Sequence, residues 1–500
     1  MNFRRSVMRC KGEEGQTIIL AALAMGIFLI GAVGLAIDGA HLYAQRQMAQ
    51  AAADAAAQAG IMSIFDNTYN IAGNLAGFST SGPFTCGSTG TSTPCAYAIR
   101  NGFGSASDTV TVSFPPASAA PGVTLSTFYP VNLIQVTIQR QVNTTLMRLL
   151  GPTASTIQVT AIAAIVDVLA PVPILVTHPT YPYTFAIGGT PSITICGGPS
   201  KSIQVNSNNS FAARRAASSS GTATVNLTHA GPPDPGNCTT GTGASFGVWG
   251  GPTSPFYTFL FGSTGKYLQP ASPMNDPLAG VAPPPVPTTL GTQTPLANGV
   301  SGCPAAPVKA CVLYTPGLYP NGINGKLQTV VFEPGIYYVQ NGGVTCNALC
   351  DMYMATGYTD TITGTGWTGN IMIYNTGVGS FNLSANANIS LVGAPANSQY
   401  LGILLFEDRY AAANTGTNAH SLGGGGAMML QGTIYLTNTL AIMNADPTQY
   451  QALQLQGGSG SGTTIQGEII VGTLSMGGTG TITMDLNNNA LNVQEVALVE

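Results

Sequence analysis

The pattern of hydrophobic positions changes abruptly along this chain of 500 residues. Residues 17–37, TIILAALAMGIFLIGAVGLAI, contain no charged side chain. As a helix they would span about 31 Å, enough to cross the hydrocarbon core of a bilayer. The segment is longer than the apolar region of a cleavable signal peptide and continues into further helix. We therefore predict a retained transmembrane helix at 17–37, preceded by a tail at 1–16.

Charges that flank this segment predict its orientation. Four cations precede it: Arg4, Arg5, Arg9 and Lys11. Within the first twenty residues after it, the only cation is Arg46. Because loops rich in Lys and Arg stay in the cytoplasm, the tail at 1–16 should be cytoplasmic and the remainder exported.

Residues 38–60 continue the helix and are dominated by alanine, the strongest helix former. Arg46, Gln50 and Asp54 lie four apart and can bond along one face. The alanines would let another backbone approach closely. Two interpretations are open: the helix packs on its own domain, or it packs against partner helices in an assembly. The candidate assembly residues are Asp38, Tyr43, Arg46, Gln50 and Asp54.

From residue 181 onward, helical periodicity gives way to short β-rich runs bounded by Gly, Asn and Thr. The related runs GNIMIYN, GILLFED, GTIYLTN and GEIIVGT begin at residues 369, 402, 432 and 467, so a unit recurs every 30 to 35 residues. Such a repeat is typical of stacked coils. We predict a mainly β protein with a right-handed parallel β-helix at 181–500, closed by a last rung near the C-terminus. A β-sandwich is the alternative.

Residues 231–310 interrupt this pattern because they are rich in Pro and Gly. Proline donates no backbone hydrogen bond, so PLAGVAPPPVPTTLGTQTPLANG should not form a strand ladder. We predict a long excursion on the solenoid surface.

Charge content argues against one class of function, and cysteine content indicates the compartment. Only 7% of residues are charged and the net charge is −4, without basic runs, which argues against nucleic-acid binding. Eight cysteines follow the predicted span, and an even number in an exported segment indicates disulfides. We predict pairing between sequence neighbours: Cys86–Cys95, Cys196–Cys238, Cys303–Cys311 and Cys346–Cys350.

The N-terminal stretch resembles TadE/TadG-like proteins of the Flp (tight-adherence) pilus machinery. The resemblance rests on Gly15 and Gln16 before the apolar span, then Asp38, Tyr43 and Arg46, and the ending AADAAAQAG at 52–60. A second stretch, 134–166, resembles the close of the same module. Together they imply a small extracytoplasmic α+β module at 38–168 and a linker at 169–180.

Signatures of catalysis are weak. The densest charge in the exported body is Glu407, Asp408 and Arg409, a candidate ion or sugar site, although an ion pair at a strand end is the simpler interpretation. The four histidines are far apart in sequence, and CNALC (346–350) lacks the other half of a zinc site. We predict no enzyme, no cofactor and no metal.

The sequence thus predicts a single-pass protein of the bacterial inner membrane, with most of the chain periplasmic or extracellular. The resemblance implies a structural role in Flp/Tad pilus assembly or surface attachment, with other pilus-assembly or pilin-like proteins as partners and surface glycans as further candidates. The rivals are a pectate-lyase-like enzyme that binds or degrades polysaccharide and an adhesin unrelated to pili.

Overall fold

The structure is a computed structural model that forms two compact units, Met1–Val166 with Val496–Glu500, and Asp167–Glu495. The first is called the N-terminal module here, and the second the solenoid. The residues that the structure describes are 14–66, 68–69, 77–88, 90–126, 129, 131–149, 153–169, 172–215, 223–253, 257–347, 349–376, 379–385, 387–395, 398–400, 402–410, 420–437, 453–457, 462–486 and 492–499.

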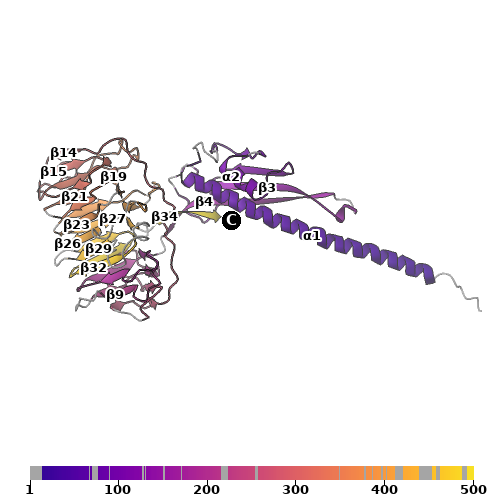
Figure 1. Ribbon diagram of the computed structural model, residues 1–500, viewed down its shortest axis with the longest axis horizontal. Helices are drawn as coiled ribbons and strands as arrows, with labels where there is room; N and C mark the ends of the chain where they lie inside the picture. The colour runs from indigo at the N-terminus through magenta and orange to yellow at the C-terminus, as the bar shows by residue number, and fades with distance from the viewer. Residues whose placement is uncertain are drawn as a thin grey trace, which may run out of the picture. The chain divides into compact units, whose positions relative to one another are not determined.

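The N-terminal module is a long helix packed on a sheet whose first four strands pair antiparallel (Figure 1). The sheet has the strand order β1-β2-β3-β4-β34, and β3 and β4 form a hairpin in register from Leu133↔Ala164 to Asn143↔Ala154. The elements are α1 (Glu14–Phe65), β1 (Phe84–Thr85), α2 (Thr93–Arg100), β2 (Asp108–Ser113), the 3-10 turn η1 (Ala117–Ala119), β3 (Leu133–Asn143), the 3-10 turn η2 (Met147–Leu149), β4 (Ala154–Leu169) and β34 (Asn492–Val499).

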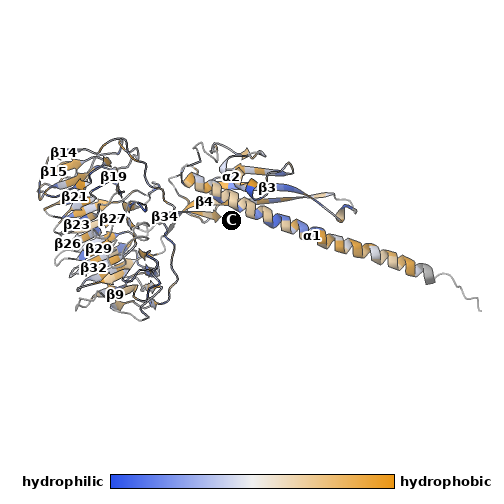
Figure 2. Ribbon diagram, viewed as in Figure 1, coloured by the Kyte–Doolittle hydropathy of each residue, from blue (hydrophilic) through white to orange (hydrophobic). Residues whose placement is uncertain are grey.

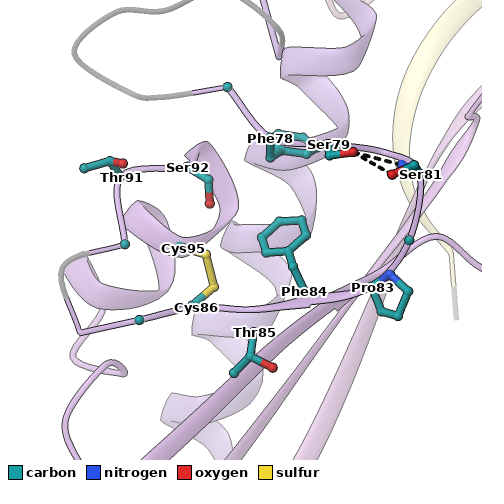
Figure 3. Close-up of a pocket in the computed structure, with 14 residues that line it drawn as sticks. Phe78, Ser79, Ser81, Pro83, Phe84, Thr85, Cys86, Thr91, Ser92 and Cys95 are labelled. Carbon is teal, nitrogen blue, oxygen red and sulfur yellow. Dashed lines mark hydrogen bonds between the residues drawn. A yellow bond between two sulfur atoms is a disulfide. The ribbon is translucent and has the colours of Figure 1, made fainter.

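Helix α1 has two halves with different surroundings. Residues 17–33 in its first half are apolar and largely exposed, as the orange end of α1 in Figure 2 shows. Its second half buries Ala49, Ala52, Ala53, Ala56 and Ala57 against the module. A disulfide between Cys86 and Cys95 joins the segment after β1 to α2 (Figure 3).

The C-terminal strand β34 corrects one prediction. Residues 486–499 were expected to form the last rung of the β-helix and its closing cap, but β34 is the edge strand next to β4 in the module sheet. Val496 packs against the module core. The alternating residues of this strand suit either sheet, so the pattern alone did not distinguish them.

The solenoid consists of three sheets, named I to III in the order in which the chain visits them. Sheet I contains, in sheet order, β13 (Tyr267–Leu268), β11 (Ser245–Val248), β8 (Lys201–Val205), β5 (Ile174–Val176), β31 (Ile469–Val471), β28 (Thr433–Leu436), β25 (Ile403–Glu407), β22 (Ile371–Asn375), β19 (Gly335–Val339) and β16 (Gly317–Tyr319). Sheet II contains β17 (Ile323–Asn324), β20 (Val344–Cys346), β23 (Phe381–Ala385), β26 (His420–Gly424), β29 (Leu453–Gly457), β32 (Leu474–Gly478), β6 (Phe185–Ile187) and β9 (Ala213–Arg215). Sheet III contains β12 (Thr258–Leu260), β10 (Thr224–Asn226), β7 (Ser192–Gly197), β33 (Thr481–Leu486), β30 (Thr463–Gln466), β27 (Met428–Gln431), β24 (Ile389–Val392), β21 (Asp351–Met354), β18 (Thr329–Phe332), β15 (Cys311–Tyr314) and β14 (Gln293–Leu296).

The predicted repeat is the stack of sheet I. The four related runs are β22, β25, β28 and β31, and they pair in parallel in this order. Within the described strands of the three sheets, the pairings are parallel except that of β14 with β15. Successive parallel strands wound through three sheets confirm the predicted parallel β-helix rather than the sandwich.

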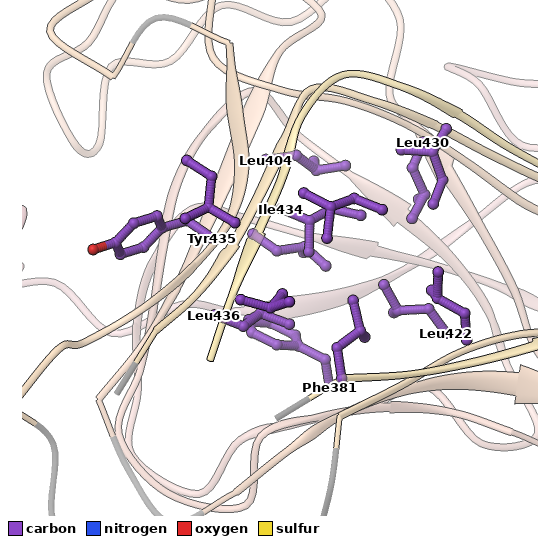
Figure 4. Close-up of a cluster of buried hydrophobic side chains, with 14 of the residues drawn as sticks. Phe381, Leu404, Leu422, Leu430, Ile434, Tyr435 and Leu436 are labelled. Carbon is purple, nitrogen blue, oxygen red and sulfur yellow. The ribbon is translucent and has the colours of Figure 1, made fainter. Parts of the chain in front are cut away.

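Alternation along each strand builds the solenoid core. In β28, Ile434 and Leu436 point into the coil together with Leu422 and Leu430, whereas Tyr435 points away from them (Figure 4). These residues are fully buried, and each such Leu or Ile contributes roughly 1.5–3 kcal/mol. The core continues from coil to coil through inward columns such as Ile373, Leu405, Ile434, Ile469 and Ile174.

The chain does not wind from one end of the solenoid to the other. It enters at β5, in the middle of sheet I, and winds outward through β8, β11 and β13. It restarts at the far end with β15 and winds back until β31, β32 and β33 pair with β5, β6 and β7. In Figure 1 the yellow strand β32 therefore lies next to magenta strands. The predicted linker at 169–180 is corrected, because β5 lies within it.

The crossover between the two ends explains the Pro-rich excursion. Residues 269–290, called the strap here, bond to Asn206 after β8, to Tyr435 on β28 and to Leu318 on β16, so they run along the outer face of sheet I. This strap lies within the surface excursion that was predicted at 231–310. That prediction is wrong for 245–268, which supplies β11, β12 and β13, and for β14, which pairs with β15 despite Pro295.

Candidate membrane anchor and assembly surface

The first half of α1 exposes a contiguous apolar surface, and exposing such a surface to water is energetically unfavourable. Ile18 is 69% exposed, Phe28 73% and Ile37 50%. Among the described residues, α1 is the helix long and apolar enough to cross a membrane, and its most apolar window is 6% buried. An exposed apolar cylinder of this length suits a lipid environment.

The alanine face of α1 packs within the module. A Cβ atom placed on Gly60 would lie 2.6 Å from the Ile134 side chain of β3. The helix therefore approaches the sheet closely because its side chains here are small. Of the two interpretations from the sequence, packing on its own domain describes this face.

Asp38 is buried and acts inside the module. Its carboxylate accepts hydrogen bonds from the backbone N–H groups of Thr145 (2.9 Å), Leu146 (3.0 Å) and Met147 (2.6 Å), at the tip of the β3–β4 hairpin. The bond from Met147 is foremost among those that lower the pKa of Asp38. Its place in an exposed assembly surface was predicted wrongly, because the hairpin tip covers it.

The other four candidate residues lie along one stretch of α1. Tyr43 is 66% exposed and Arg46 is also exposed. Gln50 donates to Asp54 Oδ1 at 2.8 Å, as the spacing of four predicted, and also to the carbonyl of Thr160 at 3.2 Å. Tyr43 and Arg46 are therefore the candidates that remain available to a partner.

An ion pair that the sequence did not reveal ties the helix to the sheet. Arg140 on β3 contacts Asp108 on β2 with Nε–Oδ1 at 2.5 Å and Nη2–Oδ2 at 2.9 Å, and it also donates to Gln45 on α1. Its guanidinium lies 3.9 Å from the centre of the Phe103 ring. Burial raises the pKa of Asp108, but bonds from Arg140 and Ser105 outweigh it and hold the pKa well below its usual range. One feature of the sequence could have indicated this pair. Charged residues are scarce in this chain, so an Arg within an alternating strand is expected to pair with an acidic residue on the neighbouring strand.

A shallow pocket of about 460 Å³ lies over the Cys86–Cys95 disulfide (Figure 3). Phe78 and Phe84 form part of its wall, and Ser79 and Ser81 share a hydrogen bond at its rim. Its described lining offers hydroxyl and backbone groups but no acid or base that titrates near neutral pH. The geometry does not suit general acid–base catalysis.

The residues of the candidate ion or sugar site, Glu407, Asp408 and Arg409, do not form one site: Glu407 and Arg409 bond to different parts of the solenoid. Glu407 faces His420, with the carboxylate 3.3 Å from Nε2, and both are buried. Arg409 donates to Tyr435 Oη at 2.8 Å and to the carbonyl groups of Leu278 and Val281 in the strap. The ion pair expected at the strand end is replaced by these contacts, and Glu407 pairs with His420 instead.

A second acidic group lies beneath the strap. Glu468 at the start of β31 is fully buried, and Asp276 of the strap accepts from Tyr435 Oη at 2.6 Å. Burial, followed by the nearby Asp276, raises the pKa of Glu468 well above its usual range. Burial also raises the pKa of Asp276. Within the described part of the chain, no three His, Cys, Asp or Glu side chains gather as metal ligands would.

All four predicted disulfides are present: Cys86–Cys95, Cys196–Cys238, Cys303–Cys311 and Cys346–Cys350. The pair at 346–350 is therefore a disulfide rather than half a zinc site. Cys10 lies outside the described residues.

Comparison with known proteins supports the N-terminal resemblance. A protein-family model described as "Putative Flp pilus-assembly TadE/G-like" matches residues 15–63. No curated protein matches the chain. A solved structure, "Crystal structure of competence-associated pilin ComZ from Thermus thermophilus", is similar at 9% identity and a TM-score of 0.20, covering 78% of this chain and 84% of that one. The matched residues are those of α1 with its exposed apolar half and its alanine face. Residues 15–63 of this chain are therefore similar to the TadE/G-like segment of Flp pilus-assembly proteins.

Proposed function

We propose that this protein is a non-catalytic, membrane-anchored component of Flp/Tad-type pilus assembly or surface attachment. The observation that carries the proposal is that the segment with the pilus-assembly match is also the helix whose first half is unsuited to water. That half is the anchor, and the module and solenoid lie outside the membrane.

Export of both units is supported by the four disulfides, which persist in oxidising compartments. The cations before residue 17 favour a cytoplasmic tail and a location in the bacterial inner membrane. Protease added to spheroplasts should degrade the solenoid while a tag on residue 1 survives.

The partner surface proposed on α1 consists of Tyr43 and Arg46. Both are exposed just beyond the apolar half, and Tyr and Arg are residue types that often dominate binding energy. The expected partners are pilin-like or other pilus-assembly proteins with a complementary helix near the membrane surface.

A pull-down from solubilised membranes tests this role. The double variant Tyr43→Ala, Arg46→Ala of the full chain should recover pilus-assembly proteins about thirtyfold less well than the wild type, since each of the two lost contacts is worth about 1 kcal/mol. Gln58→Ala, at an exposed position on the same helix, is the matched control. Equal recovery from all three proteins would refute the proposed surface.

An enzymatic role on polysaccharide is the rival. The strap bonds to Tyr435 on the outer face of sheet I, and the acidic side chains at 407 and 276 bond within the protein. These contacts favour a structural solenoid. Purified full-length protein should not turn over acidic polysaccharide, and measurable cleavage lost with Glu407→Gln would overturn the non-catalytic assignment.

A further inference from the structure

We infer that the tip of the β3–β4 hairpin, residues 144–149, is a second membrane contact of the N-terminal module. The inference rests on the proposed anchoring of α1. Its partner is the phospholipid interface, with an anionic headgroup near Arg148.

The tip is seated on α1 inside the predicted span. Gly34 and Asp38, one helical turn apart, are both buried, whereas Val33, Leu35 and Ile37 beside them are 51%, 61% and 50% exposed. A Cβ atom on Gly34 would lie 3.0 Å from the Cβ of Leu146. Leu146 therefore packs on a glycine in the apolar run, and the flanking residues still face outward.

The level of this contact corresponds to the membrane boundary. Gly34 lies three residues before the end of the apolar run at Ile37, which is about 4.5 Å along the helix axis. A bilayer that covers residues 17–37 therefore reaches the depth at which Leu146 touches the helix. The apolar surface of the tip is thus continuous with that of the anchor.

Asp38 fixes the tip at this level. Its carboxylate binds three consecutive backbone N–H groups, at Thr145, Leu146 and Met147. The adjoining turn η2 places the half-buried Met147 and the exposed Arg148 beside the span. An apolar residue followed by a cation suits the interface, where the cation can reach a phosphate.

Lipid quenching of site-specific labels tests the inference. The full chain with Cys10→Ser is reconstituted into phosphatidylcholine vesicles that contain brominated lipids. A single cysteine at Met147→Cys carries an environment-sensitive fluorophore, while the eight paired cysteines remain as disulfides. Phe28→Cys marks the middle of the span, and Ser118→Cys, exposed beyond β2 at the opposite end of the sheet, is the control in water.

We expect strong quenching at Phe28→Cys by deep bromines, quenching at Met147→Cys by shallow bromines, and none at Ser118→Cys. If Met147→Cys behaves like Ser118→Cys while Phe28→Cys is quenched, the tip does not touch lipid and the anchor stands. If Phe28→Cys is not quenched, the anchoring itself fails. Arg148→Cys, which replaces an exposed side chain, repeats the tip measurement without altering packing.

Charge at the tip gives an independent readout. Adding phosphatidylglycerol to the vesicles should increase quenching at Met147→Cys, and Arg148→Glu should reduce this lipid-dependent increase about fivefold. An increase that Arg148→Glu leaves unchanged would remove the headgroup contact from the inference. A label protected by a second protein chain instead of lipid would show no dependence on brominated lipid and would count against it.

Discussion

The helix face of the N-terminal module and the centre of the solenoid are packed with side chains of different size. Where α1 meets its sheet, the helix contributes Ala49, Ala52, Ala53, Ala56 and Ala57. At the centre of the solenoid coils, the buried residues are mostly larger, such as Phe381, Leu405 and Ile434. A helix that must lie close to a sheet needs small residues, whereas a hollow coil must be filled by large ones. The two regions should therefore respond in opposite ways to changes in side-chain volume.

The largest expected effect comes from creating a cavity in the solenoid core. Phe381→Ala removes a fully buried ring that packs 5.3 Å from His420, and should cost about 3–5 kcal/mol in the free energy of unfolding. Calorimetry of the detergent-solubilised protein should show the solenoid transition lowered and the module transition unchanged. Lowering of both transitions would show that the units do not unfold separately.

Filling the module should have an intermediate effect. Ala53→Leu adds three carbon atoms to a face that has no exposed surface, and should cost about 1–3 kcal/mol. Ala51→Leu, at an exposed position on the same helix, is the matched control and should be nearly neutral. A neutral Ala53→Leu would mean that the helix and sheet are not closely packed, which would break the comparison.

The smallest effect concerns a charge under the strap. Because the pKa of Glu468 is raised in the folded state, the unfolded chain releases its proton at a lower pH, so this residue lowers stability as the pH rises above about 4.3. Glu468→Gln should raise the free energy of unfolding by about 1 kcal/mol at pH 8 and by less at pH 4. Glu495→Gln, at an exposed position, is the control. An equal gain at both pH values would contradict the assignment of the effect to ionisation.

One carboxylate from each region shows a second difference, which is how far along the sequence its hydrogen-bond partners lie. Asp38 binds N–H groups more than a hundred residues away and joins two elements of the module. Asp234 in the solenoid accepts from Gly236, Asn237, Thr239 and other residues just after it, and so organises its own loop. Neighbours in sequence can be anticipated from spacing, but partners across the fold cannot. This is why the local disulfide pairs were predicted correctly and the role of Asp38 was not.

The same distinction governs the fold. The spacing of 369, 402, 432 and 467 correctly predicted that β22, β25, β28 and β31 stack. The pairing of β31 with β5 joins Ile469 to Ile174, and nothing in either short apolar strand marks the other as its neighbour. The strap was recognised by its prolines. Its bonds from Tyr435 and Arg409 join residues more than a hundred positions apart in the sequence, so they could not be anticipated from spacing.

The entry of the chain at the middle of the solenoid has a mechanical consequence. Two covalent connections join the units, one from β4 to β5 and one from β33 to β34, and β4 and β34 are neighbours in a single sheet. A pulling force on the solenoid is therefore shared by two strands, and cleavage of either connection leaves the other intact. Such a double tether withstands load and a single proteolytic cut better than a chain that leaves by one strand.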